Sequence, residues 1–298
     1  ALGDDTANLR EVAVDQFIIA IAIFVAIVPE GLPIILVITL ALGMRNMARH
    51  KAIIRRMKAV ETLGSTTVIC SDKTGTLTKN QMTARQLTTT EGTFTISGEG
   101  FKPSGDLSYN GTVVTNDELS GFQSDLAFRL SAACLSLCHN SHISKVDGQW
   151  QALGDPTDSA CAVLGWKING DVKKFAQRHS RLHEFFFDTT RKRMSVIHDY
   201  EGERWVFSKG GAGGYVSLVE WKIKEGEIVP IEQSDFELAS KANKEMAGQA
   251  MRVIALCARR LDDDEDIEDI NTVESSFIFL GLVGIMDPPR AEVKDAIA

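Results

Sequence analysis

The sequence has no excess of positive charge, and this removes one broad class of function. Its 298 residues include 32 lysines and arginines against 40 aspartates and glutamates, for a formal net charge of −8. A general nucleic-acid binder normally presents a basic surface, so we expect no nucleic acid as a partner. The hydrophobic and charged fractions, 44% and 24%, are those of ordinary globular chains. The length suffices for one large domain or two ordinary ones.

A disulfide framework is also lacking. Five cysteines occur, an odd number without regular spacing, at positions 70, 134, 138, 161 and 257. This pattern predicts reduced thiols in a cytosolic setting. Cys134, Cys138 and His139 follow helical spacing, but no second ligand pair has the spacing of a zinc finger. We therefore expect buried thiols on an amphipathic helix rather than a metal site.

Three other signatures are missing. KGGAGG lacks the third glycine of a dinucleotide fingerprint, and LDDDEDIEDINTVE lacks the glycine at the sixth position of a calcium-binding loop. We expect the second stretch to be a solvated acidic loop. No secretory n-region precedes the first apolar run, and the sequence starts at Ala1 without a methionine. These features favour a piece of a longer chain over a signal-bearing precursor.

A long apolar run is the first strong feature that is present. From Phe17 to Met44 the only ionisable residue is Glu30, and this stretch exceeds the roughly 20 residues that cross a bilayer core. Acidic residues precede the run, whereas a series of bases follows it before the next acid, namely Arg45, Arg49, Lys51, Arg55, Arg56 and Lys58. The positive-inside rule then predicts an integral membrane protein with residues from about 45 onward in the cytoplasm. A buried helix of a soluble protein is the alternative.

The apolar run contains the stretch VAIVPEGLP, from Val25 to Pro33. Each proline removes a backbone donor and clashes with the preceding turn, so nearby carbonyls lose their helical partners. In a membrane such carbonyls must line a protein-enclosed or wet cavity. Together with the Glu30 carboxylate they form a set of hard oxygen ligands suited to a small cation. The alternative is a proline kink with a protonated Glu30 that has no function.

CSDKTGTLT, from Cys70 to Thr78, places an aspartate after an apolar stretch. Thr66 to Cys70 is β-branched and apolar, which predicts a buried strand. An acid after such a strand points into the ligand crevice of an α/β sheet. Asp72 could therefore attack phosphorus and form an aspartyl-phosphate, with Mg²⁺ on Asp72 and nearby oxygens. The order of residues differs from that of a P-loop, and an aspartate that caps the next helix is the alternative.

The rest of the sequence alternates between strand patterns and helical patterns. QLTTTEGTFTISGEGF, after Asn80, predicts strands and turns, and helical periodicity covers Ser124 to Leu137. FFFDTTRKRMSVIHDY predicts a strand, a basic turn and a strand, while RWVFSKGGAGGY and MRVIALCARRL predict further strands. An aromatic face, lysines, an arginine and a glycine-rich turn together suit adenine and a polyphosphate.

CSDKTGTLTKNQMT, from Cys70 to Thr83, resembles the phosphorylation motif of the P-type ion-transporting ATPases. PEGLP and the linking stretch AIIRRMKAVETLGSTTVICSDKTG resemble the calcium-pump-like branch of that family. The resemblance implies one transmembrane helix and a Rossmann-like, haloacid-dehalogenase-like phosphorylation domain of α/β class, interrupted by an α+β nucleotide-binding domain. The implied divisions are an extracytoplasmic loop (1–16), the fourth membrane helix (17–49), the first part of the phosphorylation domain (50–80), the nucleotide-binding domain (81–286) and the return into the phosphorylation domain (287–298).

The resemblance implies an ATP-driven cation pump that is phosphorylated on Asp72, with Ca²⁺ as the first choice of ion. Lys73 and Thr74 would assist catalysis, and Asp72 and Thr74 would hold Mg²⁺. The transported ion would bind Glu30 and the carbonyls of Val25, Ala26 and Val28. The expected partners are the lipid bilayer, further membrane helices and an actuator domain. Three alternatives stay open: a Na⁺/K⁺ or H⁺ pump, a tethered phosphatase, and an ATP-binding module without catalytic activity. Thr74 disfavours the phosphatase, since such enzymes carry a second aspartate there.

The resemblance also assigns residues to the nucleotide. Phe187 would stack on adenine beside Met194, Lys192 and Lys209 would line the nucleotide, Gly210 would allow close approach, Asp158 would contact the base, and Arg252 would reach the phosphates. Asp287 and Arg290 complete this set at the return crossing of the chain, opposite Asn80 and Gln81. The sequence departs from the family in three places: Asp158 replaces the usual glutamate, Thr189 an arginine, and KGGAGG the common KGAPE. These departures affect nucleotide affinity more than phosphoryl chemistry.

Overall fold

The chain divides into two units, residues 1–70 and 71–298. The structure is a computed structural model that describes residues 4–27, 29 and 31–297. The division lies inside the segment 50–80 that was expected to open a phosphorylation domain. The domain limits near residues 80 and 286, and the extracytoplasmic placement of residues 1–16, remain predictions.

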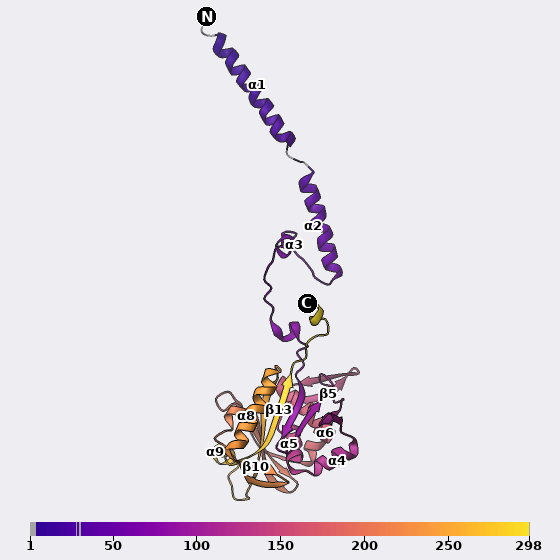
Figure 1. Cartoon of the computed structure of the whole chain (residues 1–298), viewed down its shortest axis with the longest axis vertical. Coiled ribbons are helices and arrows are strands. Elements are labelled where there is room, and N and C mark those ends of the chain that lie inside the picture. Colours follow the sequence, from indigo (N-terminus) through magenta and orange to yellow (C-terminus); the bar gives the residue numbers. More distant parts are fainter. Residues whose placement is uncertain (1–3, 28, 30, 298) are drawn as a thin grey trace. The chain divides into compact units, whose positions relative to one another are not determined.

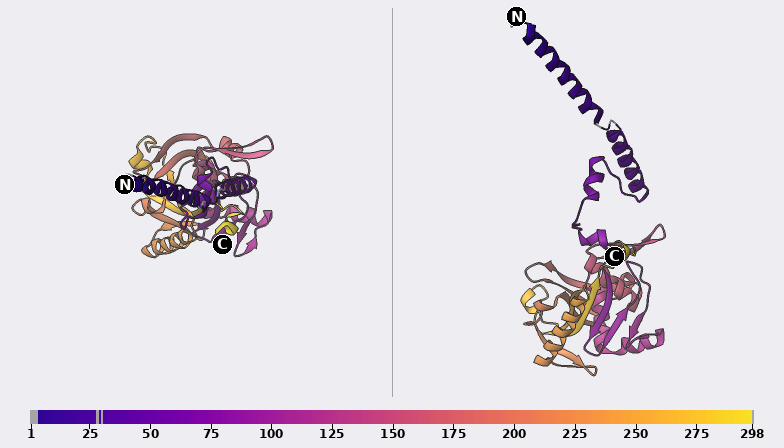
Figure 2. Two further views of the ribbon diagram at one scale, coloured as in Figure 1. Left: turned by 90° about the horizontal axis from the view of Figure 1, so that it is seen from above. Right: turned by 45° about the horizontal axis from the view of Figure 1, so that its top comes forward.

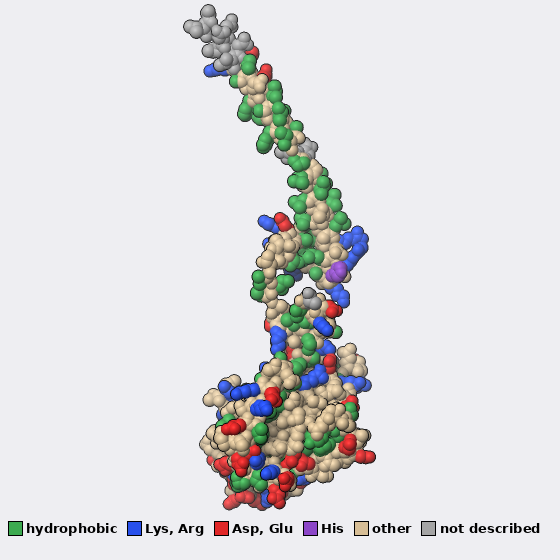
Figure 3. All heavy atoms as spheres, in the orientation of Figure 1, with side chains coloured by type: hydrophobic (Ala, Val, Ile, Leu, Met, Phe, Trp, Pro, Cys, Tyr) green, Lys and Arg blue, Asp and Glu red, His purple; other side chains and the backbone are tan. Residues whose placement is uncertain are grey.

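Helices make up most of the first unit. They are α1 (Asp4–Ile27), α2 (Leu32–Arg49) and α3 (Lys58–Gly64). The described residues from Arg10 to Arg49 have the length and the apolar composition needed to cross a membrane. Figure 3 shows hydrophobic side chains along α1 and α2. Residues 4–16 were expected to be a loop. They are helical instead, since α1 begins at Asp4.

The helix break that the two prolines predict is confirmed. α1 ends at Ile27, and α2 begins at Leu32 with Pro33 in its first turn. Pro29 has no N–H, so the carbonyl of Val25 lacks the donor that the helix would otherwise supply four residues later. Val25 and Ala26 lie in the last turn of α1. Val28 and Glu30 lie outside the described residues, so the ion site remains a prediction.

The prediction of a buried strand over Thr66–Cys70 is wrong. These residues have no regular secondary structure and are exposed, with 75% exposure at Val68 and 85% at Ile69. A strand satisfies its backbone N–H and C=O groups only on a neighbouring strand. No strand among the described residues pairs with this segment. The β-branched composition therefore predicted a tendency that the described chain does not realise.

An eleven-stranded sheet forms the centre of the second unit (Figure 1). Its strands are β1 (Thr83–Thr89), β2 (Thr93–Ile96), β3 (Leu107–Tyr109), β4 (Thr112–Val113), β7 (Arg181–Asp188), β8 (Arg193–Tyr200), β9 (Glu203–Gly211), β10 (Val219–Lys224), β11 (Glu227–Pro230), β12 (Arg252–Leu261) and β13 (Phe277–Met286). The main order is β4-β3-β2-β1-β13-β12-β9-β8-β7, and its neighbours are antiparallel. β10 pairs in parallel with β13 and antiparallel with β11. A separate hairpin joins β5 (His142–Val146) to β6 (Gln149–Leu153).

Helices cover both faces of this sheet, which gives the mixed α and β content expected of the second unit. They are α4 (Asn116–Ser124), α5 (Leu126–Leu137), α6 (Pro156–Asn169), α7 (Val172–Arg178), α8 (Gln233–Gly248) and α9 (Ile270–Val273), with α10 (Val293–Ile297) near the end of the chain. Side chains of β12 alternate between the two layers: Leu256 and Ala258 belong to the cluster with α5 and α6, and Ala255 and Cys257 to the cluster with α8. The rest of the predicted phosphorylation domain remains a prediction.

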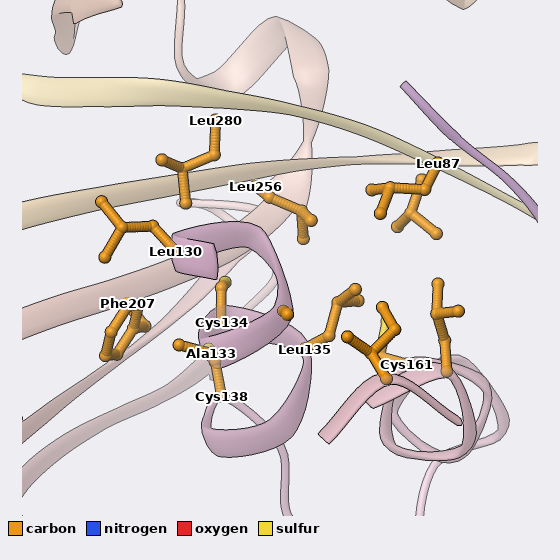
Figure 4. Packing of buried hydrophobic residues seen from close by; sticks show 14 of the residues in the cluster. Leu87, Leu130, Ala133, Cys134, Leu135, Cys138, Cys161, Phe207, Leu256 and Leu280 are labelled. Carbon is orange, nitrogen blue, oxygen red and sulfur yellow. The ribbon is translucent and has the colours of Figure 1, made fainter. Parts of the chain in front are cut away.

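The helix predicted over 124–137 is confirmed as α5, and a break at Asp125 separates it from α4. The Asp125 side chain accepts a hydrogen bond from the backbone N–H of Phe128 at 2.8 Å, which caps α5. Cys134 and Cys138 are buried near Phe207 and Leu256 (Figure 4). Their thiols lie 3.6 Å from the carbonyls of Ser208 and Met194 respectively. The prediction of buried thiols on this helix is confirmed.

Candidate functional site

Seven of the residues that were assigned to a nucleotide line one cavity of about 510 Å³ in the second unit. They are Asp158, Phe187, Lys192, Met194, Lys209, Gly210 and Arg252. We call this the first cavity. Its volume lies within the range of pockets for small molecules and cofactors. The structure thus brings together residues that span almost a hundred positions of the sequence.

The order of strands explains this convergence. β7 ends at Asp188 and β8 begins at Arg193, so these two ends of the antiparallel hairpin lie next to each other. Gly210 at the end of β9 pairs with Arg193, and the start of β12 pairs with Gly211 through Ile254. The end of β7, the start of β8, the end of β9 and the start of β12 therefore lie side by side at one end of these four strands. The N-terminus of α6 adds Asp158.

Phe187 and Met194 form an apolar part of the first cavity. Phe187 is 60% exposed although it borders the cavity, whereas Met194 is 3% exposed. An exposed aromatic face beside a buried thioether provides a surface on which a flat ring can stack. Because stacking needs an open face, the exposure of Phe187 suits a ligand better than it suits a role in the core.

Lys209 and Asp158 form a buried ion pair in the wall of the cavity. The Nζ–Oδ1 distance is 2.6 Å, and the side chains are 5% and 18% exposed. The second carboxylate oxygen of Asp158 accepts a hydrogen bond from the backbone N–H of Asn140 at 3.1 Å. Burial alone lowers the pKa of Lys209, but the Cys161 sulfur and the Asp158 carboxylate raise it, and the net shift is upward. Lys209 therefore stays charged, which suits an anionic ligand.

His139 lies close to this pair and was considered from the sequence only as a metal ligand. Burial first, and then the charge of Lys209, lower the pKa of His139 to about 4. Its ring is therefore neutral at pH 7. Both of its ring nitrogens are buried without a hydrogen-bond partner among the described residues.

Five residues that line the first cavity were not assigned to it from the sequence: Asp155, Thr157, Gly211, Val253 and Ile254. Asp155 caps α6 by accepting hydrogen bonds from the backbone N–H groups of Thr157 and Asp158, at 2.7 and 3.2 Å. Thr157 accepts a hydrogen bond from Nη1 of Arg252 at 2.8 Å. The sequence DPTD contained a signal for the cap, because an aspartate followed by proline commonly starts a helix. It contained no signal for the contact with Arg252.

Lys192 has a left-handed backbone, with φ of +55°. Its N–H donates to the Asp188 carbonyl at 2.6 Å, and its own carbonyl accepts from the N–H of Gly211 at 3.1 Å. A Cβ on Gly210 would lie 2.3 Å from this carbonyl, so only glycine fits there. The close approach that Gly210 permits is therefore to the Lys192 backbone.

A second cavity of about 420 Å³ adjoins the segment after Asp72. It is lined by Lys73, Thr74, Asn80, Met82, Pro156, Ala250, Met251, Arg252, Ile285 and Asp287. Arg252 lines both cavities. Asp72 is exposed directly before the short turn η1 (Lys73–Leu77), in which Gly75 has a φ of +76°. Asp72 does not line either cavity.

Asp287 and Arg290 do not line the first cavity. They join the two crossings of the chain, which are the segment before β1 and the segment after β13. The Asp287 carboxylate accepts hydrogen bonds from Thr78 Oγ1 at 2.5 Å and from the N–H of Gln81 at 3.1 Å. Arg290 donates from its N–H to the Leu77 carbonyl and from Nη2 to the Gly75 carbonyl, each at 3.0 Å. In the right view of Figure 2 the C-terminal part of the chain lies beside the turn η1. The structure therefore links the turn after Asp72 to the end of β13.

The residues near Asp72 are compatible with Mg²⁺. Carboxylate and hydroxyl oxygens, as on Asp72 and Thr74, are the ligands that this ion prefers, together with phosphate and water. Within residues 4–27, 29 and 31–297, no group of three or more histidines, cysteines, aspartates or glutamates is placed to hold a metal. An ion here would take its remaining ligands from phosphate oxygens and water.

Comparison with known proteins matches the second unit to a family model. The model described as P-type ATPase, cytoplasmic domain N, matches residues 128–292, which is more than half of the chain. The match covers all seven predicted residues of the first cavity.

Curated proteins resemble a larger part of the chain. A cation-transporting ATPase, pma1, from Synechocystis is 34% identical over 285 residues, covering 95% of this chain and 31% of that protein. A calcium-transporting ATPase from Bacillus subtilis is 34% identical over 284 residues, with the same coverage. The calcium-transporting ATPase 1 of Lactococcus lactis is 35% identical over 295 residues, covering 99% of this chain and 30% of that protein. The chain thus spans about a third of the length of these relatives.

Proposed function

The chain belongs to the P-type ATPase family, and on this basis we propose that it contains the nucleotide-binding and phosphorylation sites of an ATP-driven cation pump. The proposed ion is Ca²⁺, because the Bacillus subtilis and Lactococcus lactis relatives are named calcium-transporting ATPases. A Na⁺/K⁺ or H⁺ pump would share the same phosphoryl chemistry.

One observation carries the proposal: Arg252 lines both the first cavity and the second cavity. Adenine would stack on Phe187 in the first cavity, with Lys192 and Lys209 near the phosphates. Arg252 would then direct the polyphosphate toward the second cavity, where Lys73 and Thr74 follow Asp72. Leaving its contact with Thr157 would free the guanidinium, whose planar donors suit phosphate oxygens.

The proposed reaction is a phosphoryl transfer to Asp72. A carboxylate oxygen of Asp72 forms a bond to the γ-phosphorus, the bond from that phosphorus to the bridging oxygen breaks, and ADP leaves with the bonding electrons. Mg²⁺ when bound would neutralise charge on the phosphates. Lys73 would add positive charge beside the transferred group, and Gly75 permits the tight turn around it. Asp72 is exposed, so the nucleotide-binding residues must approach it for transfer.

The two crossings suit such an approach. Asp287 and Arg290 link them through hydrogen bonds to Thr78, Gln81, Leu77 and Gly75. Two chain segments held together at one point can act as a hinge. The sheet and the turn after Asp72 could then move about this hinge while they stay connected.

In the proposed pump α1 and α2 form the fourth membrane helix, with residues from about 45 onward in the cytoplasm. Pro29 leaves the carbonyl of Val25 without its helical donor, as an ion site in a membrane requires, and Ala26 lies in the same last turn of α1. Glu30 and Val28 would complete that site. Further membrane helices and an actuator domain of the longer protein would be needed for transport.

Phosphoenzyme formation tests the proposal. The intact parent protein is incubated with γ-labelled ATP, with and without Ca²⁺, as wild type and as Asp72→Asn. Acid-stable, hydroxylamine-sensitive label that requires both Ca²⁺ and Asp72 is expected. Label that requires Asp72 but responds to Na⁺ or pH would change the ion and keep the mechanism. Bound ATP without label under any cation would favour a nucleotide-binding module without catalytic activity.

A further inference from the structure

Glu274 is a buried carboxylate that lies outside both cavities. It follows α9 as the last residue of the acidic stretch LDDDEDIEDINTVE, and it is 4% exposed, whereas Asp263 in the same stretch is fully exposed. A buried carboxylate is costly unless charged or polar donors satisfy it. The stretch is therefore more than a solvated acidic loop, because its final residue belongs to the interior.

Three side chains from the β7–β8 hairpin donate to Glu274. Nη1 of Arg191 donates to Oε1, Nε of Arg193 donates to Oε2 at 2.6 Å, and Oγ of Ser195 donates to Oε1 at 2.7 Å. The arginine side chains are 22% and 14% exposed, so the cluster is shielded from water and salt. Both carboxylate oxygens are thus engaged by charged donors.

The two arginines stand on either side of Lys192, whose side chain lines the first cavity. Arg191 also donates to the carbonyl of Phe186 at 2.7 Å, and Arg193 to the carbonyl of Gly214 at 3.3 Å. The turn that holds Lys192, and the end of β7 that holds Phe187, are therefore linked to the two arginines that bind Glu274. Lys192 has a left-handed backbone and depends on these supports more than an extended residue would.

The same cluster continues to the strand that carries Lys209. The hydroxyls of Ser195 and Ser208 lie 2.8 Å apart, and that of Ser208 lies 2.7 Å from the hydroxyl of Tyr215. These hydroxyls are buried. Ser208 directly precedes Lys209, so one continuous set of hydrogen bonds runs from Glu274 to the backbone beside each lysine of the first cavity.

We propose that Glu274 is a positioning residue for the nucleotide: through Arg191, Arg193 and Ser195 it holds Lys192 and Lys209 at the distance at which they meet the phosphates. The inference rests on the proposed function, because it assumes that the first cavity binds ATP. Glu274 also offsets the charge of one of the two arginines. Loss of its charge would release Arg191 and Arg193 and loosen the turn between them.

The test uses the full chain in detergent, with ATP and adenosine as probes. Glu274→Gln keeps the volume and removes the charge, and Glu274→Asp keeps the charge on a shorter arm. The matched control is Asp235→Asn, because Asp235 on α8 forms an ion pair at 2.7 Å with Lys222 on β10, with side chains 20% and 14% exposed. Binding is measured by calorimetry and competition. Backbone hydrogen exchange is measured for peptides that cover residues 189–193 and 210–214.

Glu274→Gln is expected to weaken ATP binding by about tenfold, the effect of losing one strong charge-assisted hydrogen bond, while adenosine binding changes little. Glu274→Asp recovers part of the affinity, and Asp235→Asn leaves it unchanged. Exchange in the two peptides rises in Glu274→Gln alone. Equal ATP affinity of Glu274→Gln and wild type would overturn the inference and leave the proposed function intact. If the wild type binds no ATP, the proposed function fails, and unchanged exchange in Glu274→Gln would then overturn the positioning role as well.

Discussion

At the scale of single residues, Phe186 and Phe187 are neighbours with different surroundings. Both rings are largely exposed, at 68% and 60%, yet only Phe187 lines the first cavity. Since neither ring belongs to the core, changing either one should leave the fold intact. The pair therefore separates ligand binding from stability.

Phe187→Ala is expected to weaken ATP binding by about tenfold or more, because stacking of a base on an aromatic side chain contributes roughly 1–3 kcal/mol. The control Phe186→Ala should bind ATP as the wild type does. Calorimetric titration of the three proteins gives the affinities, and thermal unfolding checks that all are folded. Equal losses in both variants would contradict the role of Phe187.

His198 is a residue whose burial makes stability depend on pH. Burial lowers its pKa to about 4, and the Arg181 guanidinium, whose Nε lies 3.4 Å from Nε2 of His198, acts in the same direction. In the unfolded chain the pKa is about 6.5. Between these two pKa values the unfolded state binds a proton and the folded state does not. The contribution of His198 to stability is therefore fully present above pH 6.5 and is lost as the pH falls toward 4.

Between pH 7 and pH 5 the free energy of unfolding should fall by about 2 kcal/mol on account of His198. His139, whose pKa is also about 4, should contribute similarly. Denaturant titrations at pH 7, 6 and 5 measure this slope, and His198→Gln should make it shallower. A variant with the full slope of the wild type would show that His198 titrates normally in the folded chain.

At the scale of elements, a glycine controls the pairing of the central strand β13. Its side chains Ile278 and Leu280 belong to the layer with α5, whereas two residues beyond Leu280 the side chain of Leu282 belongs to the layer with α8. The change occurs at Gly281, which has a φ of +149°, next to an irregularity in the pairing with β12. A bulge of this kind lets one strand serve both layers.

Gly281→Ala should lower the free energy of unfolding by at least about 2 kcal/mol, because a Cβ there would lie 2.1 Å from the carbonyl oxygen of Thr88. Gly121→Ala is the control. Gly121 lies inside α4 with nothing within 4 Å of an added Cβ, so this variant should gain about 0.5–1 kcal/mol. Chemical denaturation compares both with the wild type. A neutral Gly281→Ala would mean that the strand can shift to accept the methyl group.

At the scale of the whole molecule, the two units differ in what their surfaces need. Between Arg10 and Ile27 the side chains of the first unit are exposed, including Phe24 at 73%. Apolar surface of this extent requires lipid, detergent or other helices. The second unit has large buried clusters on both faces of its sheet. It should therefore fold without the first.

Residues 71–298 alone are expected to be soluble without detergent and to unfold with the same midpoint as the second unit of the full chain. Differential scanning calorimetry of both proteins, the full chain in detergent, gives the midpoints. The full chain should in addition bind to liposomes that the shorter protein does not bind. Aggregation of residues 71–298, or a midpoint lower by more than about 5 °C, would show that the sheet depends on the first 70 residues.

The sequence by itself determined what depends on neighbouring residues. The apolar run, the break at Pro29 and Pro33, the hairpin around the basic turn and the helix after Asp125 all follow from composition and periodicity over a few residues. The family motif around Asp72 is likewise contiguous. The same local reasoning failed at Thr66–Cys70, because a strand exists only where another strand pairs with it.

The tertiary structure decided every contact between distant residues. Thr78 and Asp287 are 209 positions apart, and Arg191 and Glu274 are 83 positions apart. The ion pair of Lys209 with Asp158 and the contact of Arg252 with Thr157 join different elements in the same way. An acidic stretch in the sequence cannot reveal which of its carboxylates is buried, because burial depends on how strands far apart in the chain are ordered in the sheet.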